Sequence, residues 1–385
     1  MEQTQITIKK NSNITPHQAV LSLVLFNFGS SVIMGINTKV NQDAWIAILL
    51  ATLIAVPLFL IYARILKLFP KKDIFEISDL LFGKWGSKAI AILFTWYALF
   101  LAALVLRNFS EFTEITSMPE TPQLPIMILM ILTTIYLARS DMRAIGKWSV
   151  IMVFLVLLVV LLTFSASMQQ MRLDDILPIF EHPPEQIAQT TFQIFSFPYA
   201  ETVMFLGVAN SFKKDGRPYK MLFYGLILIF IIFLLVFLRN LSLLGRTMMA
   251  LSFFPSYVTA RIIEIGDFIA RIEGSISSNF LLAGIVKISI ILMVAAKGLT
   301  KMFNLKNYRT MVLPAGMIVL ALCAILYENT MQMYAFIDYY AYYAFPFQVI
   351  IPLAILIAGE IHTRKQKNRT KKPAKPAAKT SGATG

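Results

Sequence analysis

Two ionisable side chains stand inside long apolar stretches of this sequence, where a charge is costly. Glu201 lies in the stretch TFQIFSFPYAETVMFLGV, and Lys287 lies in LLAGIVKISIILMV. An ionisable group in such a place is a functional candidate by default. We expect Glu201 to carry a proton, to bind an ammonium, or to be a protonated carboxyl satisfied by Ser and Tyr neighbours. We expect Lys287 to be a fixed cation that bridges its helix to the first helix, or a structural partner of Glu201 or of backbone carbonyls.

Two of the apolar stretches contain a helix-breaking pattern, about two-thirds along the first stretch and near the middle of the sixth. The first contains residues 28–31, Phe-Gly-Ser-Ser, in which a flexible residue precedes two hydroxyls that compete for backbone hydrogen bonds. The sixth contains residues 196–199, Ser-Phe-Pro-Tyr, in which Pro198 removes a backbone donor and clashes with the preceding turn. Membrane helices tolerate a break only where the freed backbone groups line a cavity or bind something. The two patterns therefore predict a small-molecule site.

The chemistry of two broken helices fits an amino acid as the ligand. Exposed amides of a half-helix attract a carboxylate, and freed carbonyls accept an ammonium. We expect the amides of residues 29–31 to bind the carboxylate and the carbonyls around residue 196 to accept the ammonium, while two aromatic side chains close over the ligand. The predicted ligand-binding residues are therefore Gly29, Ser30, Ser31, Ser196, Phe197 and Tyr199.

The composition shows which solvent these residues meet. Of the 385 residues, 57% are apolar and 15% are charged, and the mean hydropathy is +0.68, whereas a soluble domain carries about 25% charged residues. A membrane crossing is helical and needs roughly 20 apolar residues. The predicted spans are 16–36, 43–66, 88–109, 122–138, 147–168, 188–209, 219–241, 275–298, 309–327 and 341–361.

These spans define three parts of the chain. Residues 1–13 are predicted to be a cytoplasmic segment, residues 14–361 an all-α integral membrane domain of ten transmembrane helices, and residues 362–385 a basic, disordered cytoplasmic tail. The first apolar run is long enough to span and follows a polar segment, so we expect it to be retained rather than cleaved as a signal peptide.

The basic residues give an independent test of the topology. If the N-terminus is cytoplasmic, 27 of the 35 Lys and Arg residues fall on the cytoplasmic side of the ten spans, as expected of a membrane protein. Both termini are therefore predicted to be inside, and the net charge of +14 reflects topology rather than nucleic-acid binding. The two predicted breaks fall in the first helix of each five-helix half, as a 5+5 inverted repeat requires.

Two segments outside the spans have their own patterns. Residues 71–84 place apolar side chains on one helical face, which predicts a helix lying on the cytoplasmic surface. Residues 251–273 are apolar but carry five charged residues. We interpret this second segment as an outer re-entrant or surface helix that follows Pro255, acting either as a lid or as a merely amphipathic connector.

Other kinds of site are not indicated. The chain has one cysteine and three histidines, none at a metal-binding spacing. It has no nucleotide-binding glycine loop, nucleophile elbow or pair of catalytic carboxylates. We therefore predict no enzymatic activity, no metal and no cofactor.

Several motifs carry a resemblance to a known family. They are ITPHQAVLSLVLFNFGSSVIMGI, NQDAWIAILLATLIAVPL, LFGKWG, FSFPYAET and FFPSYVTARIIEIGDFIARIEG. Together they resemble the B-subunit family of spore germinant receptors, a branch of the amino acid–polyamine–organocation (APC) transporter superfamily. The resemblance covers about residues 14–361 and implies the LeuT-like APC fold with broken helices 1 and 6.

The resemblance also implies a function and partners. It implies a multi-pass protein of the cell membrane or spore inner membrane that recognises a nutrient, commonly an amino acid, sugar or nucleoside. The implied partners are a germinant receptor A subunit and a C-subunit lipoprotein. The family's binding positions map onto residues 29–31 and 197–201, where Ala200 stands in place of a glycine found in many relatives. The alternative is a proton-coupled amino acid permease of the same fold, with Glu201 as the titrating group.

Overall fold

The computed structural model describes residues 13–34, 39–213, 216–263 and 272–370. These ranges are almost wholly helical and contain one isolated parallel β-bridge, between Ile14 and Phe212, so the predicted all-α class is confirmed. The α-helices are α1 (Pro16–Met34), α2 (Ala44–Leu68), α3 (Ile74–Ser117), α4 (Gln123–Arg139), α5 (Met142–Ser167), α6 (Pro184–Ser196), α7 (Met204–Gly207), α8 (Pro218–Leu251), α9 (Pro255–Ile262), α10 (Ile272–Met302), α11 (Arg309–Ile325), α12 (Thr330–Phe345) and α13 (Ile351–Thr370). Short 3-10 segments are η1 (Asn41–Asp43), η2 (Leu173–Ile176), η3 (Tyr199–Val203) and η4 (Ala209–Ser211), and η5 (Pro346–Ile350) is a π-helical turn.

Many of these helices have the length and the apolar composition of a membrane-spanning helix. In the part of the chain that the structure describes, six helical stretches are long and apolar enough to cross a membrane: Asn41–Leu68, α3, α5, α8, Ser277–Met302 and Thr330–Gln366. Helices α4 and α11 are apolar but shorter. The molecule is therefore a multi-pass membrane protein, and the count of ten crossings stays a prediction.

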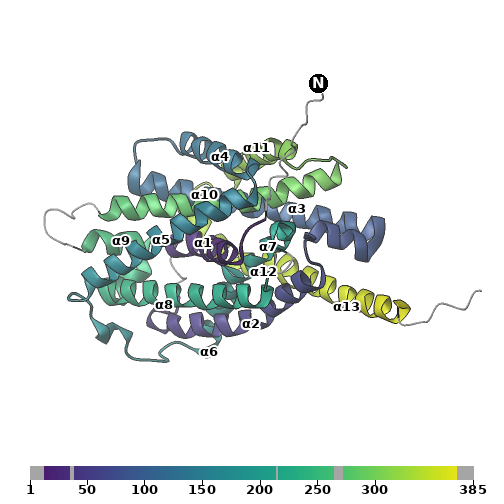
Figure 1. Ribbon diagram of the computed structural model, residues 1–385. Helices are drawn as coiled ribbons and strands as arrows, with labels where there is room; N and C mark the ends of the chain where they lie inside the picture. Colours follow the sequence, from purple (N-terminus) through teal and green to yellow (C-terminus); the bar gives the residue numbers. More distant parts are fainter. Residues whose placement is uncertain (1–12, 35–38, 214–215, 264–271, 371–385) are drawn as a thin grey trace, which may run out of the picture.

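Helix α10 lies at the centre of the bundle. It contacts α1, α3, α4, α5 and α11, and Figure 1 shows it running between α4 and α11 on one side and α8 and α2 on the other. Two glycines allow its close approach to α3, since a Cβ at Gly284 would lie 2.5 Å from the ring of Phe109 and one at Gly298 would lie 1.9 Å from Thr95 Oγ1. Small residues at such contacts are typical of packed membrane helices.

The predicted helix over residues 71–84 is present as the first part of α3. Asp73 and Glu76 form a capping box at its start, each side chain accepting a hydrogen bond from the other's backbone amide. Gly83, with φ of 64°, separates this part from the long span that follows. Only glycine adopts such a φ at little cost, so Gly83 sets the angle between the two parts.

The chain outside the bundle differs in detail from the sequence prediction. Helix α9 begins at Pro255, as expected for the segment 251–273, but residues 264–271 of that segment lie outside the described residues. Helix α13 continues to Thr370, so the segment that was predicted as a disordered tail from residue 362 begins as helix. Figure 1 shows α13 extending beyond the body of the bundle. Residues 371–385 and 1–12 are not among those described.

Candidate ligand site at the break in the sixth span

The predicted break in the sixth span is present. Helix α6 ends at Ser196, Phe197 is extended with φ of −125° and ψ of 108°, and the chain resumes as the 3-10 segment η3 before α7. Pro198 accounts for this, because it lacks a backbone donor and forces the residue before it out of the helical region. The break divides the span into α6 and an inner part of residues 199–211.

The prediction of a break in the first span is wrong. Helix α1 is continuous through residues 28–31, and within it Ser31 Oγ donates back to the carbonyl of Asn27 at 3.0 Å. Gly29 faces α10, where a Cβ would lie 3.5 Å from the backbone of Ala283, an ordinary contact distance. The amides of residues 29–31 are therefore engaged in the helix, and the free donors predicted for a carboxylate are not formed.

Glu201 and Lys287 form a buried ion pair beside the break. Lys287 Nζ lies 2.5 Å from Glu201 Oε2, and the two side chains are 0% and 1% exposed. The same ammonium donates to Ser30 Oγ on α1 at 2.6 Å. The other carboxylate oxygen of Glu201 accepts a hydrogen bond from Tyr340 on α12 at 2.7 Å. The pair thus joins α10, η3, α1 and α12 at one point.

This arrangement satisfies two predictions for Lys287 at once, because it both pairs with Glu201 and bridges α10 to α1. Its ammonium also lies 5.0 Å from the ring centroid of Phe26 and 5.3 Å from that of Phe197. Aromatic faces at such distances attract a cation. A buried charge is tolerated only when it is paired and hydrogen-bonded, and Lys287 meets both conditions.

A hydrogen-bonded network continues from this pair to the end of α6. The hydroxyls of Tyr340 and Tyr97 lie 3.2 Å apart, and Gln348 Nε2 donates to Tyr97 at 2.8 Å and to the carbonyl of Ser196 at 3.0 Å. Ser196 Oγ donates to Gln348 Oε1 at 2.8 Å, and Tyr62 donates to the carbonyl of Gln348 at 2.6 Å. The carbonyl end of α6 is thereby bound to the tenth span.

Sequence reasoning missed the network partners Tyr97, Tyr340 and Gln348. For Gln348 a signal exists, since this amide lies between Pro346 and Pro352 in an otherwise apolar stretch. Here the helix is a π-helical turn, a feature that often marks a functional site. For the two tyrosines no comparable signal exists, because tyrosine is common in membrane helices.

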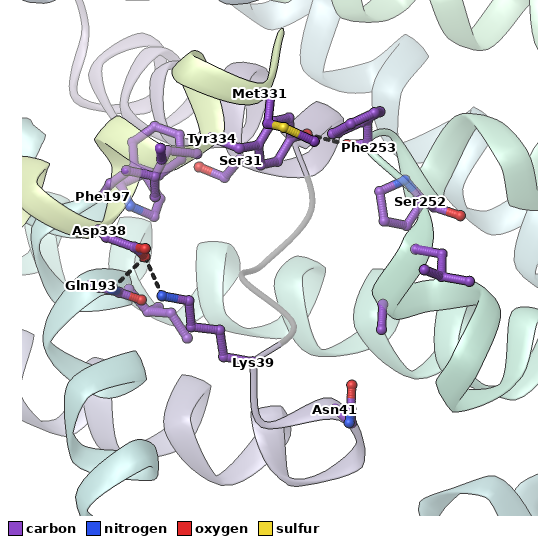
Figure 2. A pocket seen from close by; sticks show the side chains of 17 residues that line it. Ser31, Lys39, Asn41, Gln193, Phe197, Ser252, Phe253, Met331, Tyr334 and Asp338 are labelled. Carbon is purple, nitrogen blue, oxygen red and sulfur yellow. Dashed lines mark hydrogen bonds and ion pairs between the residues drawn. The ribbon is translucent and has the colours of Figure 1, made fainter.

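A cavity of about 620 Å³ opens beside the break. Phe197, Pro198 and Ser31 line it next to the ion pair, and its walls come from α6, α12 and the segment that joins α8 to α9. Figure 2 shows aromatic and polar side chains from these elements around one hollow. The segment 251–273, predicted to be a lid or a connector, borders the cavity through residues 251–253 and Pro255.

One pair of opposite charges stands in the cavity wall. Lys39 Nζ lies 2.6 Å from Asp338 Oδ1, with side chains 47% and 33% exposed. Gln193 on α6 donates to the same carboxylate oxygen at 3.2 Å, as the dashed lines in Figure 2 show. The cavity thus offers one cation, one anion and the amides of Gln193 and Asn41, in addition to its apolar lining.

The predicted ligand residues fall into three places. Ser31 and Phe197 line the cavity. Ser30 and Ser196 lie in the hydrogen-bonded network beside it. Tyr199 turns away from the cavity, is fully buried, and has its hydroxyl 2.8 Å from a threonine hydroxyl of α2. The break predicted from the sequence thus lies beside a cavity, but the sequence did not separate residues that line the cavity from residues that pack behind them.

Comparison with known proteins gives a consistent family. A family model described as spore germination protein matches residues 13–333. Spore germination protein KB of Bacillus subtilis (strain 168) is 24% identical over 379 residues, covering 96% of this chain and 98% of the relative. The putative spore germination protein YfkT of the same organism is 24% identical and covers 77% of this chain and 81% of the relative.

Solved structures with a similar fold include a transporter. MHP1, a nucleobase-cation-symport-1 family transporter, matches with a TM-score of 0.66 and 15% identity over 89% of this chain and 78% of its own. MhsT, solved in complex with L-phenylalanine, matches with a TM-score of 0.65 and 12% identity over 90% of this chain and 88% of its own. The predicted LeuT-like fold is therefore confirmed.

Proposed function

This chain belongs to the spore germination protein family, and we propose that it is the nutrient-recognition subunit of a spore germinant receptor. In this proposal a small molecule, an amino acid, binds in the cavity beside the break in the sixth span. The bound state is then passed to partner subunits, which the family resemblance gives as an A subunit and a C-subunit lipoprotein. The protein acts in the spore inner membrane with both termini on the core side.

The cavity at the break is the observation that carries this proposal. Its volume of about 620 Å³ lies in the range of about 300–1,000 Å³ typical of ligand pockets. Its lining is mainly apolar with a few polar groups, the composition that fixes a small ligand in one orientation. The cavity ends at Phe197 and Pro198, where the chain of the sixth span changes direction. A ligand there touches the one place where α6 meets the inner part of its span.

The charged pair in the wall supports a zwitterion as the ligand. Lys39 and Asp338 line the cavity and are partly exposed. They neutralise each other when no ligand is bound. An amino acid replaces this one ion pair by two, because its α-carboxylate pairs with Lys39 and its α-ammonium pairs with Asp338. No charge is then left without a partner. The similar transporter MhsT was solved with L-phenylalanine, an amino acid whose ring suits an aromatic wall such as that formed by Phe197, Phe253 and Tyr334.

Signalling requires that the ligand bind one conformation better than another, since equal affinity for both shifts nothing. Helix α6 lines the cavity through Gln193 and Ile194 and is separated from the rest of its span by the break. A ligand bound against α6 favours the position of α6 that closes on it. We propose that partner subunits detect this position.

A proton-coupled amino acid permease is the second candidate, because the buried pair of Glu201 and Lys287 lies where such a protein needs a titrating group. In the structure Glu201 is engaged by Lys287 and by Tyr340. Proton transfer on each transport cycle has to break these bonds. A sensor keeps them intact.

One experiment with the purified full chain in liposomes separates the two candidates. The twenty standard amino acids are screened for a shift in melting temperature and for uptake driven by a pH gradient. For a sensor we expect at least one amino acid to raise the melting temperature without uptake, and Asp338→Asn to weaken that effect. Asp79→Asn is the matched control, since Asp79 pairs with Lys301 outside the cavity. Uptake that is abolished by Glu201→Gln establishes the permease instead, and the absence of any stabilising amino acid contradicts the proposed ligand class.

A further inference from the structure

The cavity beside the break in the sixth span is called the outer cavity from here on. A second cavity, of about 190 Å³, lies at the opposite end of the bundle from it. It is formed where the chain enters α1, where α2 ends, and where the sixth span leads into α8. Four of its lining residues are basic, namely Lys67, Lys71, Lys213 and Arg217, and none of its lining residues is acidic. This cavity, which we call the inner basic cavity, has no part in the function proposed above.

The four cations of the inner basic cavity lie around one cavity without an acidic lining residue. Among the residues that the structure describes, none of the four forms an ion pair, whereas Arg64 pairs with Glu360 and Arg309 with Asp141. The ammonium of Lys67 lies 5.5 Å from the ring centroid of Tyr219, which holds it in place without neutralising it. The cavity is therefore a concentration of positive charge that the described residues leave unbalanced.

The interior of the inner basic cavity is apolar. Ile14, Ala19, Phe212 and Met221 line it, and all but Phe212 are buried. A cavity with an apolar interior and a cationic rim fits an amphipathic anion better than a small hydrated one. The apolar part of such a molecule is removed from water while its charge stays at the rim.

The position of this cavity indicates where such a molecule comes from. The loops that form it carry basic residues assigned to the cytoplasmic side by the charge pattern of the sequence. Basic pockets between membrane helices on that side bind acidic lipid headgroups. We propose that the inner basic cavity binds the phosphodiester of an anionic phospholipid, with its glycerol and first acyl carbons against the apolar interior.

Such a lipid contacts a structural junction of the fold. Ile14 donates its amide to the carbonyl of Ser211 at 2.9 Å and forms the isolated β-bridge with Phe212. Because Ile14 and Phe212 also line the cavity, the bound lipid holds the start of α1 against the inner end of the sixth span. Binding at this place stabilises the folded protein, and the stabilisation rises with the concentration of the lipid.

The test uses the purified full chain in vesicles of phosphatidylcholine alone and of phosphatidylcholine mixed with phosphatidylglycerol. Lipid that remains bound is identified by native mass spectrometry, and the melting temperature is measured in both vesicles. The site variant combines K67Q, K71Q, K213Q and R217Q. The matched control combines K84Q, K88Q, R139Q and K147Q, which remove the same charge from exposed positions on the same side.

We expect the wild type and the control to retain phosphatidylglycerol and to melt several degrees higher in the mixed vesicles. The site variant is expected to lose its preference for phosphatidylglycerol by about 600-fold, since each of the four cations near an acidic membrane surface contributes about a factor of five. A second variant with K67R, K71R and K213R keeps the charge and is expected to keep the lipid. Equal losses in the site variant and the control overturn the proposal, because net charge alone then explains binding. Equal stabilisation of the detergent-solubilised protein by inorganic phosphate also overturns it, because a free anion is then the ligand.

Discussion

The two parts of the sixth span are held by different neighbours. Helix α6, before the break, packs against α2 and α12 and lines the outer cavity. The inner part, residues 199–211, is bound to α10 by two buried lysines. Lys287 reaches Glu201 at one end of it, and Lys297 donates to the carbonyl of Gly207 at 3.0 Å and to Asn210 Oδ1 at 2.7 Å at the other end.

The two lysines differ in how completely they are buried. The side chain of Lys287 is 0% exposed and its carboxylate partner is 2.5 Å away, whereas Lys297 is 10% exposed and lies 3.5 Å from Asp73. Asp73 also caps α3 and accepts a hydrogen bond from Asn210 at 3.1 Å. The comparison indicates that a lysine of α10 holds each end of the inner part, so that in the proposed function a ligand in the outer cavity acts on α6 against a fixed base.

The largest effect is expected at Lys287. Lys287→Met leaves the Glu201 carboxylate buried without a cation, and breaking such a pair costs about 3–5 kcal/mol. We expect a large fall in melting temperature and in the yield of folded protein. The measurement is a thermal melt of the detergent-solubilised chain.

The double variant Lys287→Met with Glu201→Gln provides the control for this effect. It removes both charges and is expected to recover much of the lost stability, since neutral replacement of a buried pair is often tolerated. A double variant that is no more stable than Lys287→Met contradicts the view that an uncompensated charge is the cause.

At Lys297 the expected effect is smaller and has a different readout. Lys297→Met removes hydrogen bonds to the Gly207 carbonyl and to Asn210, a loss of about 1–3 kcal/mol, and loosens the inner end of the sixth span. The only native cysteine, Cys323, is buried, so a cysteine introduced by Ser211→Cys reports on this end. We expect maleimide to label it faster in the Lys297→Met background. Unchanged labelling contradicts the idea that Lys297 holds this end closed.

These contrasts show what the sequence could and could not reveal. The break at Pro198 was predictable because proline lacks a donor in any environment. The continuity of α1 was not, because Gly29 and Ser31 are compatible with a break or with a helix, and their local sequence does not decide between them. A local pattern predicts structure well only where the chain itself imposes the constraint.

The hydrogen-bonded network around Glu201 was harder to predict from the sequence than the break. Glu201 and Lys287 were recognisable because a charge in an apolar stretch is unusual, and their pairing was among the alternatives. Tyr97 and Tyr340 come from spans far away in the chain, and nothing in their local sequence marks them as neighbours of Glu201. Such partners are determined by how the helices pack against one another. This packing cannot be inferred from a single sequence.

The variants Phe197→Ala and Tyr199→Phe test the residues on either side of Pro198, the residue at which the sixth span breaks. Phe197 lines the cavity, so we expect its truncation to raise the concentration of amino acid for half-maximal stabilisation by about tenfold, or about 1.4 kcal/mol. Tyr199 contacts Thr52 instead, and its loss of one hydrogen bond is expected to cost about 1 kcal/mol of stability without altering the response to ligand. Both are measured in one set of melts with and without ligand. A ligand response weakened equally by Tyr199→Phe contradicts the assignment of these residues to opposite sides of the site.

The smallest effect is expected one turn beyond Lys297. Lys301 pairs with Asp79, but the two side chains are 39% and 40% exposed, and exposed pairs contribute about 0–1 kcal/mol. We expect Lys301→Met and Asp79→Asn each to leave the melting temperature nearly unchanged, and the small effect of either to vanish at high salt because exposed pairs are screened. Lys287, Lys297 and Lys301 then form a series on one helix in which stability follows burial rather than the presence of a partner. If Lys301→Met destabilised the protein as much as Lys297→Met, pairing at the inner surface would itself hold the fold, and the distinction between a fixed inner part and a responsive α6 would lose its physical basis.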